Sequence, residues 1–391
     1  MNSSLSLKTY SADPVVHVEF GSIISYTKVG AMVNQARKAN GLFGARYMLT
    51  QVEALQAEIQ GALTGEDIEH VHQMRVASRR LRNGLNLFKG FLSKKQAKAW
   101  QKEVRVITKA LGQARDLDIQ IDLLNRCLAE TLEDRYKPGY NRLLLRLKQQ
   151  RSLAQEEVKQ TLINLQGAET LDRMAAALTK LTAGSEGLYL YTPSLYQQAF
   201  EAIISNLDEF LSYEGFIHNP ENIAQLHAMR IAGKHLRYTL EIFAPIYGHA
   251  LDPHIRAMKN IQDLLGEIHD NDVWISWLPE FIALEEARIE DYFGNRGPLK
   301  RLLPGLHYFM EDRQRVREGG YQVFLSIWET LKYEHAWQVM REIIKAPMNI
   351  EAVLAQLPPA SEDEFSESSH NETTRDPHTV DGLPDEPGLD K

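Results

Sequence analysis

The sequence has little of what secreted, membrane-spanning or disulfide-stabilised proteins depend on. Its 391 residues include one cysteine, Cys127, which cannot form an internal disulfide. Its apolar runs fall far short of the roughly eighteen residues that a membrane span requires. The opening residues, MNSSLSLKTYSADPVV, lack the compact apolar stretch of a signal peptide. We therefore expect a cytoplasmic protein with no membrane contact, in which Cys127 is a buried thiol.

The sequence also lacks an excess of positive charge, since its formal net charge is −8. The negative charge is local, because residues 361–391 contain ten acidic and two basic residues while the preceding residues are balanced. This stretch is nearly free of aromatic residues, so residues 347–391 are expected to form an acidic disordered tail. Any basic site elsewhere must be a local concentration of cations.

Strand-like alternation is nearly absent, and helical periodicity dominates from about residue 45, so the predicted fold class is all-α. In RYMLTQVEALQAEIQGAL, apolar residues recur three and four positions apart, as on an amphipathic helix. Further helices are predicted over residues 66–92, 94–112, 116–133, 139–166, 168–181, 194–213, 220–246, 250–268, 272–292, 298–318 and 320–345. The stretch TAGSEGLYLYT at 182–192 is a connector, and Pro193 suits the first turn of the next helix. Residues 1–28 give no clear prediction.

The helical pattern occurs twice. Residues 72–88 (HQMRVASRRLRNGLNLF) align with residues 227–243 (HAMRIAGKHLRYTLEIF), with 8 of 17 positions identical. LGQARDLD at 111–118 then aligns with LGEIHDND at 265–272. Two matched blocks in the same order indicate an internal duplication, with a first half at about 29–181 and a second half at about 193–346.

Each of the two aligned helices has a cationic side and an apolar side. The cationic sides carry His72, Arg75, Arg79 and Arg82 in the first copy, and His227, Arg230, Lys234 and Arg237 in the second. The apolar sides carry Met74, Ser78, Leu81, Leu85 and Phe88, and Met229, Gly233, Leu236, Leu240 and Phe243. The following helices add Lys98, Lys102, Arg105 and Lys109, and Arg256 and Lys259.

Such a stripe of cations calls for a counter-charge. Like charges spaced four residues apart on a helix repel one another, and a bound anion would relieve the repulsion. From residue 72 to residue 82 the stripe runs roughly 15 Å along the helix axis, which suits an extended chain of phosphates better than one small ligand.

The striped helix, its second copy and the LGxxRD/LGxxHD elements resemble the CHAD domain, the conserved histidine α-helical domain, over about residues 29–346. The resemblance implies two helical bundles related by a pseudo-twofold, whose basic helices converge on a central surface or pore that binds inorganic polyphosphate. The implied ligand residues are His72, Arg75, Arg79, Arg82, Lys102, Arg105, Lys109, His227, Arg230, Lys234, Arg237, Arg256 and Lys259. Arg80 and His235 are included although they stand off the stripe, and further candidates are Lys98, Arg115, Arg151, His269 and Arg317.

The family is often joined to a CYTH triphosphatase, which carries an ExExK strand near its N-terminus. The corresponding stretch here, HVEFGSIISY, lacks that pattern. We therefore expect a binding protein with no enzymatic activity, cofactor or metal, found in the cytoplasm at polyphosphate granules.

Two other functions remain open at this point. Nucleic-acid binding would use the same charge, although aromatic residues are sparse; Trp100, between Lys98 and Lys102, is the aromatic selected for base stacking, whereas Trp274, Trp277, Trp328 and Trp337 are expected in the core. The other alternative, a metal-dependent phosphohydrolase, would use the aspartates near His269.

Those aspartates are Asp270 and Asp272, with Asp116 and Asp118 as their counterparts in the first half. Because Arg115 replaces the histidine there, we favour helix capping or orientation of arginines by Asp116 and Asp270 over metal-dependent hydrolysis.

Overall fold

The computed structural model describes residues 26–130, 133–183 and 192–348, with side chains from residue 38 onward, and every regular element in these ranges is helical. The helices are α1 (Tyr26–Thr64), α2 (Ile68–Leu87), α3 (Lys94–Glu130), α4 (Lys137–Gly167), α5 (Thr170–Thr182), α6 (Pro193–Leu211), α7 (Ile223–Phe243), α8 (Asp252–Phe293), α9 (Leu303–Tyr333) and α10 (Ala336–Lys345). The all-α prediction is confirmed for this part of the chain. Residues 1–25 and the acidic tail from residue 349 lie outside the described residues.

Four predicted helix boundaries are wrong. The helix predicted over residues 320–345 is divided between α9 and α10, which are separated by Glu334 and His335. The breaks expected near residues 113–115, 269–271 and 319 fall inside α3, α8 and α9, which are continuous. Local propensity predicted the breaks, but tertiary packing outweighs it, because Ala114 and Ile268 on these segments are buried in the core. The LGQARDLD and LGEIHDND blocks are therefore helix interiors that face their neighbours.

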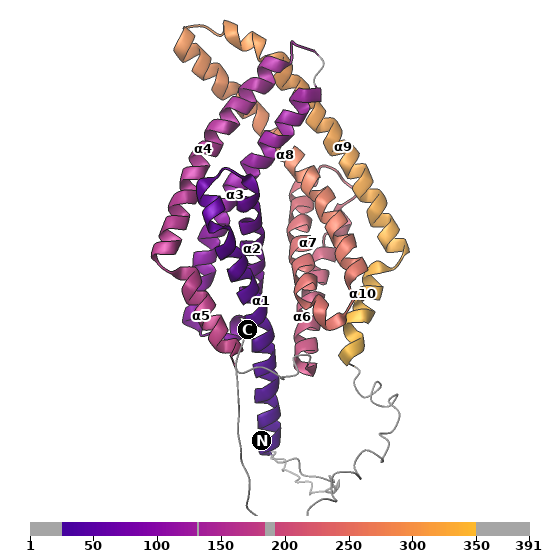
Figure 1. Cartoon of the computed structure of the whole chain (residues 1–391). Helices are drawn as coiled ribbons and strands as arrows, with labels where there is room; N and C mark the ends of the chain where they lie inside the picture. Colours follow the sequence, from indigo (N-terminus) through magenta and orange to yellow (C-terminus); the bar gives the residue numbers. More distant parts are fainter. Residues whose placement is uncertain (1–25, 131–132, 184–191, 349–391) are drawn as a thin grey trace, which may run out of the picture. The chain divides into compact units, whose positions relative to one another are not determined.

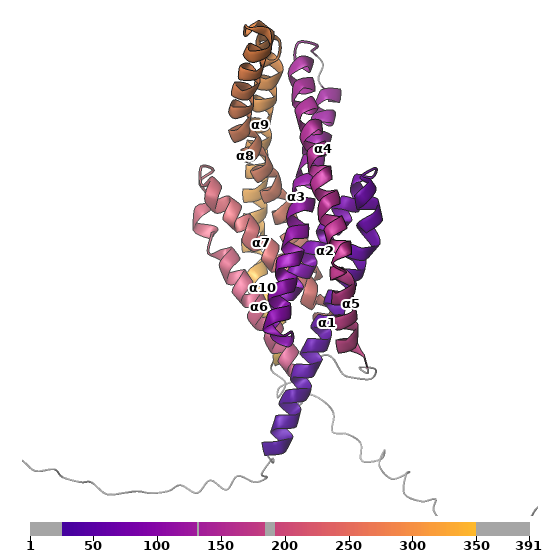
Figure 2. The same ribbon diagram turned by 90° about the vertical axis from the view of Figure 1, so that its left-hand side faces the viewer.

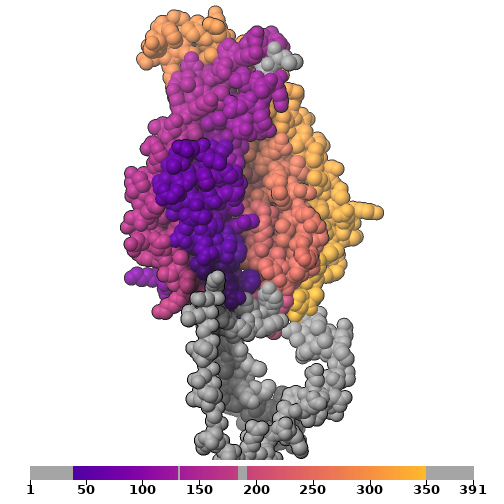
Figure 3. All heavy atoms as spheres, in the orientation of Figure 1, coloured from indigo at the N-terminus to yellow at the C-terminus, as the bar shows by residue number. Residues whose placement is uncertain are grey.

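The helices form two groups, here called the first half (α1–α5) and the second half (α6–α10). In the first half, α1 packs against α2 and α5, and α3 pairs with α4; in the second, α7 packs against α6 and α8, and α8 pairs with α9. The hairpins α3–α4 and α8–α9 extend beyond the shorter helices (Figures 1 and 2). On the face shown in Figure 3, the surface of the first half adjoins that of the second.

The apolar sides predicted for α2 and α7 are buried, which confirms that part of the wheel. Phe88 and Phe243, at the ends of these two helices, have ring centroids 6.0 Å apart. Phe43 from α1 lies 6.0 Å from Phe88 and 6.1 Å from Phe243. This aromatic group fixes the end of α2 against the end of α7.

The halves also meet where α4 and α9 begin. A Cβ atom on Gly305 would lie 2.0 Å from the carbonyl oxygen of Tyr136, and one on Gly139 would lie 2.5 Å from the carbonyl oxygen of Leu302. Only glycine permits such backbone contact. The Tyr136 and Tyr308 rings stack beside it with centroids 4.3 Å apart.

A buried ion network links α4 to α8. The side chain of Glu285 is 0% exposed and accepts hydrogen bonds from Arg142 at 3.0 Å, Arg146 at 2.7 Å and Arg288 at 2.6 Å. Burial alone would raise the pKa of Glu285, but the hydrogen bonds from Arg146 and Arg288 outweigh it and hold the pKa below its usual range.

Removing the Glu285 carboxylate leaves three arginines without their shared partner. We expect Glu285→Ala to lower the free energy of unfolding by about 2 kcal/mol, less than for a fully buried pair because the arginines are partly hydrated. Glu290→Ala removes an exposed ion pair with Arg296 and should leave the free energy of unfolding nearly unchanged. Urea denaturation of both variants measures the difference, and equal stabilities would show that the network contributes nothing.

Candidate anion-binding site

The predicted cationic sides of α2 and α7 face each other where these helices contact. Arg75 and Arg79 from α2 meet Arg230, Lys234 and Arg237 from α7, and we call these five residues the cationic cluster. They are close enough for their charges to act on one another: Arg75, Arg230 and Arg237 each lower the pKa of Arg79, and Arg75, Arg79 and Arg230 each lower that of Lys234. Cations from two distant segments therefore share one place.

The cluster is half-buried. The side chains of Arg75, Arg230 and Arg237 are 22%, 17% and 16% exposed. Burial first, and then the charges of Arg230 and Arg79, lower the pKa of Lys234 to about 7. The cluster thus holds more positive charge than its surroundings neutralise, and Lys234 is only partly protonated at neutral pH.

Several buried nitrogens at this site have no hydrogen-bond partner within the part of the chain that the structure describes. They are Nε of Arg79, Nε of Arg230, Nε of Arg115 and Nδ1 of His72. An unsatisfied buried polar group costs about 1–3 kcal/mol, so such groups are rare and call for an explanation. Oxygen atoms of a bound anion would accept hydrogen bonds from the three arginine groups.

Two exposed aspartates accompany the cluster. Asp116 on α3 accepts a hydrogen bond from Arg75 at 3.1 Å, and Asp270 on α8 lies 3.9 Å from Arg230. Both carboxylates stand inside long helices, so the helix-capping alternative is wrong for them, whereas orientation of an arginine is confirmed for Asp116. These contacts orient the side chains of Arg75 and Arg230, and the exposed aspartates do not bury the cluster.

The next aspartates along α3 and α8 have a different role. Asp118 accepts a hydrogen bond from Arg151 at 2.6 Å, and Asp272 accepts one from Arg317 at 2.5 Å. All four side chains are largely buried. Arg151 and Arg317, two of the predicted ligand residues, are therefore engaged in ties that join α3 to α4 and α8 to α9.

The predicted histidines lie at the edges of the cluster. The Nδ1 atoms of His227 and His269 are 3.1 Å apart, and His72 lies beside Arg115, whose sequence counterpart is His269. Burial and nearby cations lower the pKa of His72 and His227, and lower that of His269 to about 4. At neutral pH these imidazoles are uncharged until an anion raises their pKa.

The other predicted ligand residues are distributed around this centre. Arg80 pairs with Glu241 at 3.3 Å, and Glu241 also pairs with Arg237. Burial and the charge of Arg105 lower the pKa of Arg82. The exposed residues are Arg82, Lys98, Lys102, Arg105, Lys109, His235, Arg256 and Lys259. Among the described residues, no hydrogen bond or ion pair joins Lys98, Lys102, Arg256 or Lys259 to the cluster.

Sequence reasoning missed Tyr238 and Asn83, which occupy equivalent positions in the two aligned helices. The guanidinium carbons of Arg79 and Arg237 lie 5.7 Å and 4.6 Å from the centre of the Tyr238 ring. The Tyr238 hydroxyl and Nδ2 of Asn83 are buried and have no hydrogen-bond partner among the described residues. The helical wheel contained the signal, because this position lies about 20° from the histidine that begins the stripe.

The predictions for the tryptophan residues are partly confirmed and partly wrong. Trp274, Trp328 and Trp337 are buried, as expected. Trp100 is only 8% exposed, so its selection as a base-stacking residue is wrong; its apolar neighbours on α3 carry it into the core. Trp277 is half-buried and lines a cavity.

In the described ranges, no helix is both long and apolar enough to cross a bilayer. The same residues contain no group of three or more His, Cys, Asp or Glu side chains placed to hold a metal ion.

A family model described as the CHAD domain matches residues 46–279. The fold is similar to a crystal structure of the CHAD domain from the plant Ricinus communis, at 22% identity and a TM-score of 0.51, over 72% of this chain and 91% of that one. PptA from Streptomyces chartreusis also matches, at 15% identity and a TM-score of 0.49, over 74% of this chain and 99% of that one. No curated protein matches the sequence.

Proposed function

The chain belongs to the CHAD domain family, and we propose that it binds inorganic polyphosphate on the cationic cluster as a non-enzymatic, cofactor-free protein. The observation that carries the proposal is the set of buried arginine nitrogens, from both halves, that have no acceptor among the described residues. Phosphate oxygens are strong acceptors for guanidinium groups. The exposed cations on α2, α3 and α8 would attract the rest of a long chain.

We further infer that the halves are duplicates that together form one basic surface. Equivalent contacts support this: Arg75 with Asp116 matches Arg230 with Asp270, and Arg151 with Asp118 matches Arg317 with Asp272. The Arg75 and Arg230 Nε atoms also lie at the same distance, 3.7 Å, from the Cβ positions of two equivalent glycines, Gly112 and Gly266. A polymer of identical phosphate units is a suitable ligand for such a pseudo-twofold surface, because it can present the same groups to both halves. In the cell, the expected location is the cytoplasm, at polyphosphate granules.

Competition binding tests the proposal. Labelled long-chain polyphosphate should bind the purified protein and resist displacement by RNA or duplex DNA at equal phosphate concentration and fixed salt. Nucleic acid would need a series of stacking platforms or groove contacts along its backbone, and Trp100, the aromatic that lies among the exposed lysines of α3, is buried. Displacement by RNA at equal phosphate would favour nucleic-acid binding instead. Sustained release of orthophosphate with Mg²⁺ or Mn²⁺ present would instead reveal a hydrolase.

Affinity should depend on pH through Lys234. Its pKa is about 7 in the free protein, and bound phosphates would raise it, so binding takes up a proton as the pH rises above 7. Affinity for long chains should therefore fall about tenfold between about pH 6.5 and about pH 8.5. Long chains are used because their few terminal phosphates add little titration of their own.

Lys234→Arg is the matched control for that measurement, because a guanidinium keeps its charge throughout this range. The variant should lose most of the decline above pH 7 but retain a rise in affinity at acidic pH, where His72 and His227, whose pKa values are lowered by burial and nearby cations, take up protons. An unchanged pH profile would contradict the role given to Lys234.

A further inference from the structure

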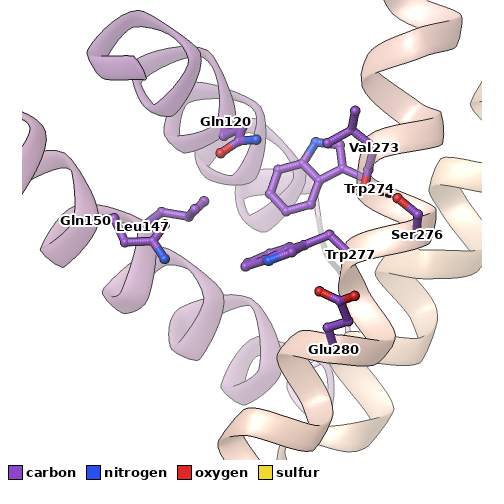
Figure 4. Close-up of a pocket in the computed structure, with 8 residues that line it drawn as sticks. All are labelled: Gln120, Leu147, Gln150, Val273, Trp274, Ser276, Trp277 and Glu280. Carbon is purple, nitrogen blue, oxygen red and sulfur yellow. Dashed lines mark hydrogen bonds between the residues drawn. The ribbon is translucent and has the colours of Figure 1, made fainter. Parts of the chain in front are cut away.

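A second candidate site lies next to the cationic cluster, where α3 and α4 of the first half face α8 of the second. It is a cavity of about 370 Å³ lined by Trp277 and Trp274 with Gln120, Gln150, Ser276 and Glu280 (Figure 4). Pockets for small ligands have volumes of about 300–1,000 Å³. The cavity is therefore large enough for one organic ring system.

Trp277 gives this cavity a fixed aromatic wall. Its ring lies 5.6 Å from Trp274 and 5.0 Å from Phe281, and Trp274 in turn meets Phe309 edge-on at 5.0 Å. Trp274 is 3% exposed, whereas Trp277 is only partly buried. Figure 4 shows both indoles projecting from α8 toward α3 and α4. The neighbours hold the Trp277 ring in place while part of it stays open to a stacking partner.

The polar groups around this wall suit a neutral ring with hydrogen-bonding edges. Gln120 and Gln150 each offer amide donors and an acceptor, and Glu280 offers a carboxylate. Within the described residues these three side chains make no hydrogen bond, so their groups are available. A carboxylate would repel a phosphate placed here, but it would accept a hydrogen bond from an exocyclic amine or ring N–H of a nucleobase.

The cavity shares one lining residue, Gln150, with a second pocket that reaches Asp116, the partner of Arg75. This second pocket is open, has a volume of about 650 Å³, and is also lined by Lys109 and Gly112. Gly112 and Asp116 are the residues against which Arg75 lies. Gln120 is one helical turn beyond Asp116.

The opposite wall repeats this spacing. On α8, Trp274 is one turn beyond Asp270, the partner of Arg230. On each wall, a lining residue thus lies about 6 Å of helical rise beyond an aspartate that contacts the cluster, and Trp277 lies about 10 Å beyond Asp270. A ligand with phosphates at one end and a ring at the other could occupy both places.

We propose that the chain binds nucleoside polyphosphates, with the base on Trp277 and the phosphate chain on the cationic cluster. The phosphate half of this inference rests on the proposed function. One cavity with one open indole accommodates one base beside several phosphates, which differs from RNA, where bases and phosphates alternate.

The test compares adenosine and guanosine 5′-tetraphosphate with inorganic tetrapolyphosphate, which has the same number of phosphates and no base. On the wild-type protein, at low salt, at least one nucleoside compound should bind about tenfold tighter than the inorganic one and should quench tryptophan fluorescence. Trp277→Leu should abolish that advantage and leave the affinity for tetrapolyphosphate unchanged, and Trp277→Phe should retain part of it. Gln120→Ala, which removes a polar group without touching the aromatic packing, should also reduce the advantage.

Equal affinity of the wild-type protein for the nucleoside tetraphosphates and for inorganic tetrapolyphosphate would overturn the inference. The inference would also be overturned if Trp277→Leu and Gln120→Ala each weakened the binding of the nucleoside compounds and of tetrapolyphosphate equally, because the two residues would then have a structural role only. If long-chain polyphosphate binds but no base preference appears, this inference alone fails. If long-chain polyphosphate does not bind either, the proposed function fails with it.

Discussion

The double variant Arg79→Gln/Lys234→Gln should bind long-chain polyphosphate about 100-fold more weakly than the wild type. Each side chain is a half-buried cation, and loss of one charge-assisted hydrogen bond to phosphate costs about 1.5–3 kcal/mol, which is about tenfold or more. Arg79 comes from α2 and Lys234 from α7, so the variant weakens both halves at once. Fluorescence anisotropy with a labelled chain at fixed salt and pH measures the change.

The same variant should fold at least as well as the wild type. Burial and neighbouring cations lower the pKa of both Arg79 and Lys234, which means that their charges cost folding free energy in the empty protein. The melting temperature without ligand should therefore stay the same or rise. The matched control is Lys180→Gln/Lys300→Gln, which removes two exposed cations of α5 and the turn before α9 and should retain near wild-type affinity. Equal losses in both doubles would show that net charge, and not the cluster, governs binding.

The two sides of α2 and α7 are the part of the structure that the sequence predicted best. Periodicity alone placed Met74, Leu81, Met229 and Leu236 on buried faces, since an apolar side must be covered. It also placed the cations on the other side. It could not show that the two cationic sides face each other, because repulsion between them makes that arrangement unfavourable unless a ligand contributes.

Helix boundaries and the partners of charged side chains were harder to predict from the sequence. The break predicted at residue 319 is absent from α9, which stays helical through Gly319 and Gly320 because it is held by packing on α8. Arg151 and Arg317 looked like ligand residues, yet their charge is met by Asp118 and Asp272, which are distant in sequence and adjacent only after α3–α4 and α8–α9 pair. Charge pattern identifies cations, but only tertiary structure separates engaged cations from available ones.

The salt dependence of binding should be as large as the effect of the double variant, because it follows from the number of cations that contact phosphate. For a flexible chain of phosphates, the logarithm of the binding constant falls with the logarithm of salt concentration with a slope of about −0.7 per neutralised charge. If the five residues of the cationic cluster all engage, affinity should fall on the order of 100-fold between about 50 mM and about 200 mM salt. Engagement of the exposed cations on α3 and α8 would steepen the slope further.

The double variant Arg79→Gln/Lys234→Gln tests the number of cations that neutralise phosphate. Without Arg79 and Lys234, the slope should become shallower by about 1.4, whereas the Lys180/Lys300 control should keep the wild-type slope. This comparison separates direct neutralisation of phosphate from an indirect loss of fold, because an unfolded or distorted site loses affinity at every salt concentration without a matching change in slope. Affinity that hardly responds to salt in the wild type would mean that the cations of α2 and α7 do not meet a polymer of phosphates.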